Sequence, residues 1–222
     1  MRKFILNNYS NLKDNVKKIC KRINRDPKKI NIVIVSKNQE LEKSKVLLDE
    51  GHMIFGENRI KEGHEKWKEV NNKKRILHFI GALQSKKVKN AMEFYNVIET
   101  LDTEKSAKNI AKFISNFKNT KAIPKIFIQV NIGNENQKNG VSINEIEGFY
   151  GECKKNYNLD IIGLMCIPPI GNSTKFFSKM LELNNLLNLN ELSMGMSSDY
   201  LEALNFKATF VRIGSLIFGE RI

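Results

Sequence analysis

Lys37 is the first residue of interest, because it follows an apolar run at a place where an amine could do chemistry. Residues 32–35 are Ile-Val-Ile-Val, and only Ser36 separates them from the lysine. Such a run is typical of a strand buried on both faces. A nucleophilic amine must be neutral, whereas a lysine with the ordinary pKa of about 10.4 is less than about 0.1% neutral at pH 7. Lys37 therefore needs burial or a neighbouring cation to lower its pKa, and otherwise it is a solvated lysine.

Two turns near the end of the sequence combine glycine with hydroxyl side chains. Residues 195–199 read Gly-Met-Ser-Ser-Asp, and residues 214 and 215 are Gly-Ser. Each turn precedes a predicted helix, where free backbone N–H groups and the helix dipole favour an anion. Glycine lets the backbone approach such a ligand closely. Either serine alone is explained as a helix cap, but two such turns in neighbouring loops favour a phosphate site.

The rest of the sequence alternates between strand-type and helix-type patterns. After an amphipathic helix at 10–23, eight apolar runs predict strands at 31–36, 52–55, 75–80, 96–100, 124–131, 159–165, 191–195 and 208–214. Helices are expected between them, near 40–50, 58–70, 85–94, 103–118, 142–157, 174–188 and 198–206. Strands that alternate with helices pair in parallel through right-handed crossovers.

Eight such strands predict an α/β fold, a (β/α)8 TIM barrel with an extra N-terminal helix. The alternative is a doubly wound open sheet, which normally has a glycine-rich turn after its first strand. Residues 35–43, VSKNQELEK, contain no glycine, and no linker rich in Pro, Gly or Ser divides the sequence. We therefore expect residues 1–222 to form a single barrel domain.

The carboxyl ends of all strands meet at one face of a TIM barrel, where ligands bind. The candidates at these ends are Lys37, Asn58, His78, Asn131, Met165, Cys166, Ser197, Ser198, Arg212, Gly214 and Ser215. The first and last strands pair when the barrel closes, so Arg212 is expected near Lys37 as a cation that lowers its pKa. The two glycine-containing turns lie in the last two loops, the usual phosphate site of these barrels.

A phosphate site, a lysine and an arginine together indicate a phosphorylated aldehyde that the lysine holds as a Schiff base. Pyridoxal 5′-phosphate (PLP) fits these features, with the arginine facing its ring nitrogen. A phosphorylated sugar aldehyde bound by an aldolase-type lysine fits them less economically.

Several longer stretches carry a resemblance to a known family. They are VSK (35–37), FGENRIKEGHEKW (55–67), HFIGALQSKKVK (78–89), IQVNIGNENQKNGV (128–141), GLMCIPP (163–169) and, between 192 and 221, LSMGMSSDYLEAL and VRIGSLIFGER. With these stretches, which span nearly the whole sequence, the chain resembles the pyridoxal-phosphate homeostasis proteins, single-domain relatives of the alanine racemase barrel.

The resemblance implies roles for individual residues. Lys37 would form the Schiff base, with Asn58 beside the cofactor and Arg212 at the pyridine nitrogen. The phosphate end would be lined by Met196, Ser197, Gly214 and Ser215. Two departures from the family pattern affect the walls of the site: Leu77 stands where tryptophan is usual, and residues 134–141 vary a loop that is usually rich in glutamate and serine.

The choice between an enzyme and a carrier depends on acid–base groups. An arginine at the ring nitrogen leaves the pyridine unprotonated, which weakens the ring as an electron sink. A racemase needs two bases, and in the racemases that this barrel resembles the second is a tyrosine of a C-terminal domain. The sequence ends at Ile222, and we expect no such domain. We therefore expect a PLP carrier and regulator of vitamin B6 homeostasis with little or no turnover of its own, and a weak PLP-dependent amino-acid racemase is the alternative. His78 could substitute as the second base, although a lone histidine in such a strand is more often a hydrogen-bonded core residue.

Composition limits the partners. The formal net charge is +13, but the lysines are spread along the chain among glutamates, so we expect no nucleic-acid binding. We expect no membrane span, because no apolar run approaches about 20 residues. The three cysteines and the absence of a secretory signal favour the cytoplasm. Neither HExxH nor paired-cysteine spacing occurs, and we expect no metal site. We also expect the protein to be a monomer, with PLP-dependent apo-enzymes as the recipients of its cofactor.

Overall fold

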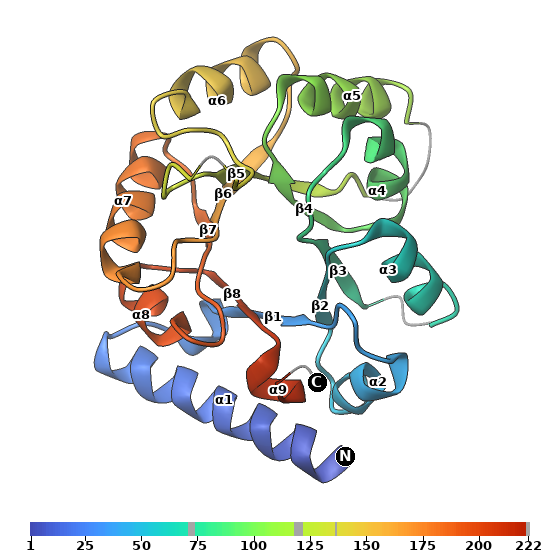
Figure 1. The fold of residues 1–222 in the computed structure, drawn as a ribbon, viewed down its shortest axis with the longest axis vertical. Helices are drawn as coiled ribbons and strands as arrows, with labels where there is room; N and C mark the ends of the chain where they lie inside the picture. The colour runs from blue at the N-terminus through green and yellow to red at the C-terminus, as the bar shows by residue number, and fades with distance from the viewer. Residues whose placement is uncertain (71–73, 118–121, 136, 221–222) are drawn as a thin grey trace.

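The closed barrel is visible in the computed structural model, which describes residues 1–70, 74–117, 122–135 and 137–220 (Figure 1). In this part of the chain eight parallel strands pair in sequence order, and the last pairs with the first. The strands are β1 (Asn31–Val35), β2 (Ile54–Glu57), β3 (Ile76–Phe79), β4 (Val97–Leu101), β5 (Lys125–Val130), β6 (Ile161–Cys166), β7 (Glu191–Ser193) and β8 (Phe210–Ile213). The predicted TIM barrel is confirmed, and the open doubly wound sheet is excluded.

Helices surround the barrel on its outer side (Figure 1). They are α1 (Arg2–Arg22), α2 (Leu41–Asp49), α3 (Ile60–Trp67), α4 (Val88–Phe94), α5 (Glu104–Ser115), α6 (Ile146–Lys155), α7 (Ser173–Leu186), α8 (Tyr200–Asn205) and α9 (Ser215–Phe218), with short 3-10 turns at Pro27–Lys29 and Ser85–Lys87. The predicted helix at 103–118 ends earlier, and its last expected residue, Lys118, lies outside the described residues, as do Asn136 and Arg221 of the family-like stretches. No helix in the described ranges has the length and apolar character of a membrane span.

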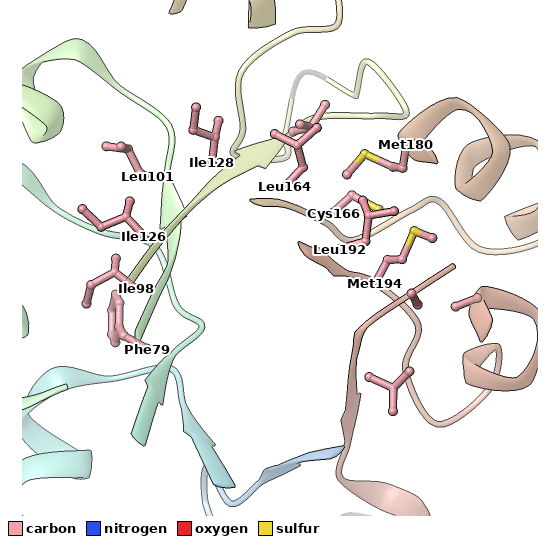
Figure 2. Packing of buried hydrophobic residues seen from close by; sticks show 14 of the residues in the cluster. Phe79, Ile98, Leu101, Ile126, Ile128, Leu164, Cys166, Met180, Leu192 and Met194 are labelled. Atoms are coloured by element: carbon pink, nitrogen blue, oxygen red, sulfur yellow. The ribbon is translucent and has the colours of Figure 1, made fainter. Parts of the chain in front are cut away.

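The alternation of side chains along each strand builds two separate cores. Outward-facing residues such as Ile98, Ile126 and Ile128 pack against the helices, and Figure 2 shows Met180 of α7 pointing toward the strand that carries Cys166. Inward-facing residues form a smaller cluster inside the barrel, made of Val97, Phe127 and Met165. This is why the strands are apolar on both faces, as expected for a parallel sheet.

The N-terminal helix is longer than the sequence predicts. It begins at Arg2 instead of Ser10 and lies along α2, α8 and α9 (Figure 1). Its buried residues are Ile5, Tyr9, Leu12, Val16, Ile19 and Cys20, so helical spacing extends well before residue 10. Asn8 Nδ2 donates to the Ile217 carbonyl oxygen of α9 at 3.1 Å, so this early part of the helix is also held by a contact with the other end of the sequence.

The second strand lies two residues later than predicted, at Ile54–Glu57 instead of 52–55. Its pairing with β1 aligns Phe55 with Ile34 and Gly56 with Val35. His52 precedes the strand, and its ring Nδ1 lies 3.0 Å from Tyr9 Oη, while Nε2 lies 2.8 Å from the Ile54 carbonyl oxygen. This arrangement fits a neutral ring, with the tyrosine donating to Nδ1 and Nε2–H donating to the carbonyl.

The buried His52 predicts a pH-dependent stability. Burial lowers its pKa from 6.5 to about 4, against the bond to Ile54, which raises it. The unfolded chain therefore binds more protons between these values, and the free energy of unfolding should fall as pH drops from about 6.5 to 4, by about 3 kcal/mol in total.

Urea unfolding of the natural protein and of His52→Gln between pH 4 and 7.5 measures this effect. Carboxylates contribute equally to both proteins, so the difference between the two curves isolates the histidine. We expect the natural protein to lose stability relative to the variant as pH falls. Parallel curves would show that His52 does not titrate as argued.

Candidate functional site

The carboxyl end of β1 presents Lys37 between the strands that carry the other candidates. Val33 aligns with Arg212 of β8, and Val35 aligns with Gly56 of β2. Lys37 follows on the inward-facing side of this alternation and is half-buried. A Cβ built on Gly214 would lie only 3.4 Å from the Val35 carbonyl oxygen, so the last glycine turn lies directly beside the end of β1.

Asn58 takes the matching place after β2. The residue is half-buried, and its Oδ1 is buried without a hydrogen-bond partner in the described part of the chain. Its backbone packs tightly against the loop after β3, since a Cβ at Gly81 would start 1.9 Å from the Asn58 carbonyl oxygen. Glycine at position 81 therefore allows the close approach that fixes Asn58. A buried acceptor without a partner is costly, and it marks a place where a ligand donor would be favourable.

The two glycine-containing turns come together as predicted. The backbone N–H groups of Gly214 and Leu216 both point at Ser197 Oγ, with N···O distances of 3.4 Å. These contacts are longer than an ordinary hydrogen bond of about 2.7–3.2 Å, so Ser197 holds the two donors weakly. Ser215, at the start of α9, is exposed. The Met196 N–H donates to Asp199 Oδ1 at 2.7 Å and therefore already has an acceptor within the protein. Two weakly held N–H donors and the Ser197 hydroxyl thus face one small region, which suits a phosphate, and Ser215 lies between the two donors in the sequence.

Arg212 is buried inside the barrel, with 3% of its surface exposed. Its Nη1 donates to Ser193 Oγ and its Nη2 to the Cys166 carbonyl oxygen, both at 2.7 Å. Nη1 also lies 3.8 Å from Glu99 Oε2. The guanidinium is therefore held by β4, β6 and β7, and Nε takes part in none of these contacts. The lowering of the Lys37 pKa by Arg212 stays a prediction. The ion pair with Glu99 makes this effect smaller, because a guanidinium whose charge is balanced acts less on its neighbours.

Glu99 joins Arg212 to a histidine. Its Oε1 lies 2.6 Å from His78 Nδ1, and its Oε2 accepts from Ser193 Oγ at 2.6 Å. Burial raises the pKa of this carboxyl, but hydrogen bonding and charge from His78, then Arg212 and Ser193, lower it below its ordinary value overall. Glu99 is thus an ionised carboxylate in the barrel interior, and His78 is a hydrogen-bonded interior residue.

Other candidates from the strand ends do not join the site. Asn131 holds its own loop together, since its Nδ2 donates to the Glu135 carbonyl oxygen at 2.9 Å. Met165 packs in the inner apolar cluster, and the Cys166 side chain packs in the outer one. Ser198 is exposed next to Ser197. Lys37, Asn58, Met196, Ser197, Arg212, Gly214 and Ser215 stay the predicted site residues.

Sequence reasoning missed the partners of Arg212. Glu99 and Ser193 lie on predicted strands, in positions whose alternation points them inward. The available signal was a glutamate within an apolar strand, Val97–Leu101, because a charged residue inside a parallel sheet needs a buried partner.

Comparisons with known proteins agree with this geometry. Residues 8–222 match the family described as "Alanine racemase, N-terminal domain". A pyridoxal phosphate homeostasis protein of Aquifex aeolicus is 33% identical over 222 residues, which cover 96% of each chain. One from Buchnera aphidicola is 31% identical and covers 95% of each chain.

This chain belongs to the pyridoxal phosphate homeostasis protein family. A solved structure of a similar protein, PipY of Synechococcus elongatus, is described as having PLP bound. It has a TM-score of 0.77 and 26% identity, and the match covers 92% of this chain and all of PipY, 100%. Family membership confirms the resemblance stated from the sequence.

Proposed function

We propose that this chain binds PLP as a Schiff base on Lys37 and holds and delivers the cofactor in vitamin B6 homeostasis. The observation that carries the proposal is the convergence of Lys37, Arg212 and the two N–H-presenting turns at one end of the barrel. Membership of the homeostasis protein family and the PLP-bound PipY structure support it.

The residues present fit the cofactor. Lys37 would hold it through the side-chain nitrogen, and the Asn58 Oδ1, buried without a partner in the described residues, would accept a hydrogen bond. The weakly held N–H groups of Gly214 and Leu216, with the Ser197 hydroxyl, suit phosphate oxygens. We propose Met196 as a side-chain contact only, because its N–H is bound to Asp199. Ser215 would add its hydroxyl.

Arg212 would face the pyridine nitrogen. When bound, PLP supplies an electrophilic carbonyl carbon and an electron-withdrawing ring. Arginine keeps its proton at any pH the protein encounters, so it donates to the ring nitrogen without protonating it. The hydrogen bonds that Arg212 donates to Ser193 and Cys166, together with the ion pair with Glu99, fix the guanidinium in place. We propose that this favours storage of the cofactor over carbanion chemistry.

A carrier is favoured over a racemase because the second base is not at hand. Of the five tyrosines, Tyr9, Tyr150 and Tyr200 belong to helices, Tyr95 directly follows α4, and Tyr157 lies two residues after the end of α6. His78 is bound to Glu99 in the barrel interior. None of these six side chains in the described residues follows directly on the carboxyl end of a strand. Residues 1–222 would form the single PLP-binding domain.

Transfer to an apo-enzyme tests this function. The protein is loaded with PLP, freed of unbound cofactor by gel filtration and mixed with a PLP-free aminotransferase. We expect the aminotransferase to regain activity, whereas Lys37→Ala taken through the same steps should restore none. Incubation of the loaded protein with L-alanine, followed by chiral chromatography, tests the alternative. D-alanine formed repeatedly by each protein molecule, and absent with Lys37→Ala, would favour a weak racemase.

The setting and partners are part of the proposal. Cys20, Cys153 and Cys166 are free thiols, which suits a reducing cytoplasm. One chain supplies every candidate residue, so we propose a monomer that serves PLP-dependent apo-enzymes. The charge of +13 is distributed along the sequence and not concentrated, and we propose no nucleic-acid partner.

A further inference from the structure

Helix α3 holds the backbone on both sides of Lys37. Lys66 Nζ donates to the Ser36 carbonyl oxygen at 2.6 Å. On the other side, the Asn38 N–H donates to Glu62 Oε1, also at 2.6 Å. Glu57, the last residue of β2, accepts from the Ser36 hydroxyl at 2.7 Å. The turn that presents Lys37 is thus bound before and after the lysine by side chains that do not belong to β1.

The three charged side chains form one connected network. Lys66 Nζ lies 2.9 Å from Glu57 Oε1 and 3.5 Å from Glu62 Oε1. With Ser36, this gives the ammonium three acceptors for its three protons. The Lys66 side chain is 7% exposed and that of Glu57 is 0% exposed. A buried lysine satisfied in this way is fixed in position, because each bond it gives up would leave one of its buried N–H donors unsatisfied.

The turn itself has one defined backbone geometry. Asn38 has a φ of +58°, in the left-handed region that most residues other than glycine avoid and that asparagine tolerates. The Gln39 N–H donates to the Ser36 carbonyl oxygen at 3.1 Å, which closes the turn around Lys37 and Asn38. The Ser36 carbonyl therefore serves both the turn and Lys66. The direction in which Lys37 leaves the backbone depends on this one geometry.

We infer that Lys66, Glu62 and Glu57 are positioning residues that aim the Lys37 amine for Schiff-base formation. The inference rests on the proposed function of Lys37. The described contacts of Lys66 and Glu62 with this turn are to backbone atoms, so they act through the orientation of the lysine. Misplacement of a reacting group by about 1 Å can cost about a hundredfold in reactivity. A turn that is fixed on both sides of Lys37 can therefore have a large effect on the rate at which its amine reacts.

The test measures two quantities separately, the labelling of Lys37 by PLP and the hydrogen exchange of the Asn38 amide. Borohydride reduction after incubation with increasing PLP, followed by peptide mass spectrometry, gives the concentration for half-maximal labelling of Lys37. We expect this concentration to rise about tenfold or more in Glu62→Ala and in Lys66→Met. Amide hydrogen exchange of Asn38 in the cofactor-free protein should become about tenfold faster in Glu62→Ala, because its charge-assisted hydrogen bond is lost.

Matched controls come from the same helix. The Lys61 side chain is 89% exposed and that of Glu65 is 60% exposed. Lys61→Met and Glu65→Ala should label Lys37 as the natural protein does. Glu62→Gln keeps an acceptor for the Asn38 N–H and should lie between the natural protein and Glu62→Ala. Because Glu62 is partly exposed, its variants test the inference even if Lys66→Met fails to fold.

The outcomes separate this inference from the proposed function. Weaker labelling together with faster Asn38 exchange supports the positioning role. Unchanged labelling in Glu62→Ala, with the natural protein labelled at Lys37, overturns the positioning role and leaves the proposed function intact. If the natural protein is not labelled at Lys37 at all, the proposed function fails, and the inference fails with it.

Discussion

Alanine in place of Lys37 is expected to abolish covalent retention of PLP. The natural protein incubated with PLP should keep the yellow absorption of a protein-bound Schiff base through gel filtration, and Lys37→Ala should lose it. Without the covalent anchor, the proposed site would hold the cofactor only through the two glycine-containing turns, Asn58 and Arg212. We expect its affinity to fall by about a hundredfold or more, as measured by equilibrium dialysis.

The control for this loss is Lys45→Ala. Lys45 lies on α2 close to the site in sequence, but its side chain is 43% exposed and paired with Glu42. This variant should retain the absorption and the affinity of the natural protein. If Lys37→Ala binds PLP as tightly as the natural protein, the cofactor is held elsewhere and the role given to Lys37 is wrong.

Leucine in place of Glu99 is expected to cost the largest amount of stability. Arg212 would then lie in the barrel interior without its counter-ion, 3% exposed, and Ser193 and His78 would lose an acceptor. Removal of one partner of a buried ion pair typically costs about 3–5 kcal/mol. Urea unfolding at pH 7 measures the loss. The matched variant Glu182→Leu removes a surface glutamate that is 60% exposed and should change the free energy of unfolding by about 0.5 kcal/mol or less.

A double-mutant cycle shows whether the cost comes from the stranded charge. Glu99→Leu combined with Arg212→Leu removes both charges, so we expect the double variant to be more stable than the sum of the single effects predicts, by about 1–3 kcal/mol. Strict additivity would mean that Glu99 and Arg212 do not interact, and it would contradict the assignment of Glu99 as the group that fixes the arginine.

Most of the fold follows from patterns in the sequence. Apolar runs such as residues 32–35 specify strands of a parallel sheet, and their count and alternation with helices specify a closed barrel. The errors came where polar residues have tertiary partners. The first helix begins at Arg2 instead of Ser10, and Asn8 in its early turns donates to the Ile217 carbonyl oxygen, a bond that is not visible in the sequence. The second strand ends at Glu57 instead of Phe55, and Glu57 has partners that the sequence does not show, Ser36 after β1 and Trp67 of α3.

The site, like the fold, has residues that could be predicted from the sequence and residues that could not. Residues at strand ends and in glycine turns could be selected, since barrel topology brings Lys37, Asn58 and Gly214 together whatever their neighbours are. The residues that contact Arg212 and the turn before Lys37 could not be selected. Glu99 pairs with Arg212 in the barrel interior, and Lys66 donates to the Ser36 carbonyl oxygen. Both contacts join elements that are distant in sequence, and an isolated charged residue in a pattern does not identify its partner. Buried charges in otherwise apolar elements are the signal that such partners exist.

The most direct test of the central claim is the position of the covalent bond. The natural protein is incubated with PLP and reduced with borohydride, and its peptides are analysed by mass spectrometry. We predict a stable pyridoxyl adduct on Lys37 that is absent from Lys37→Ala. Labelling scattered over exposed lysines, or no labelling, would contradict the assignment of this barrel end as a PLP site.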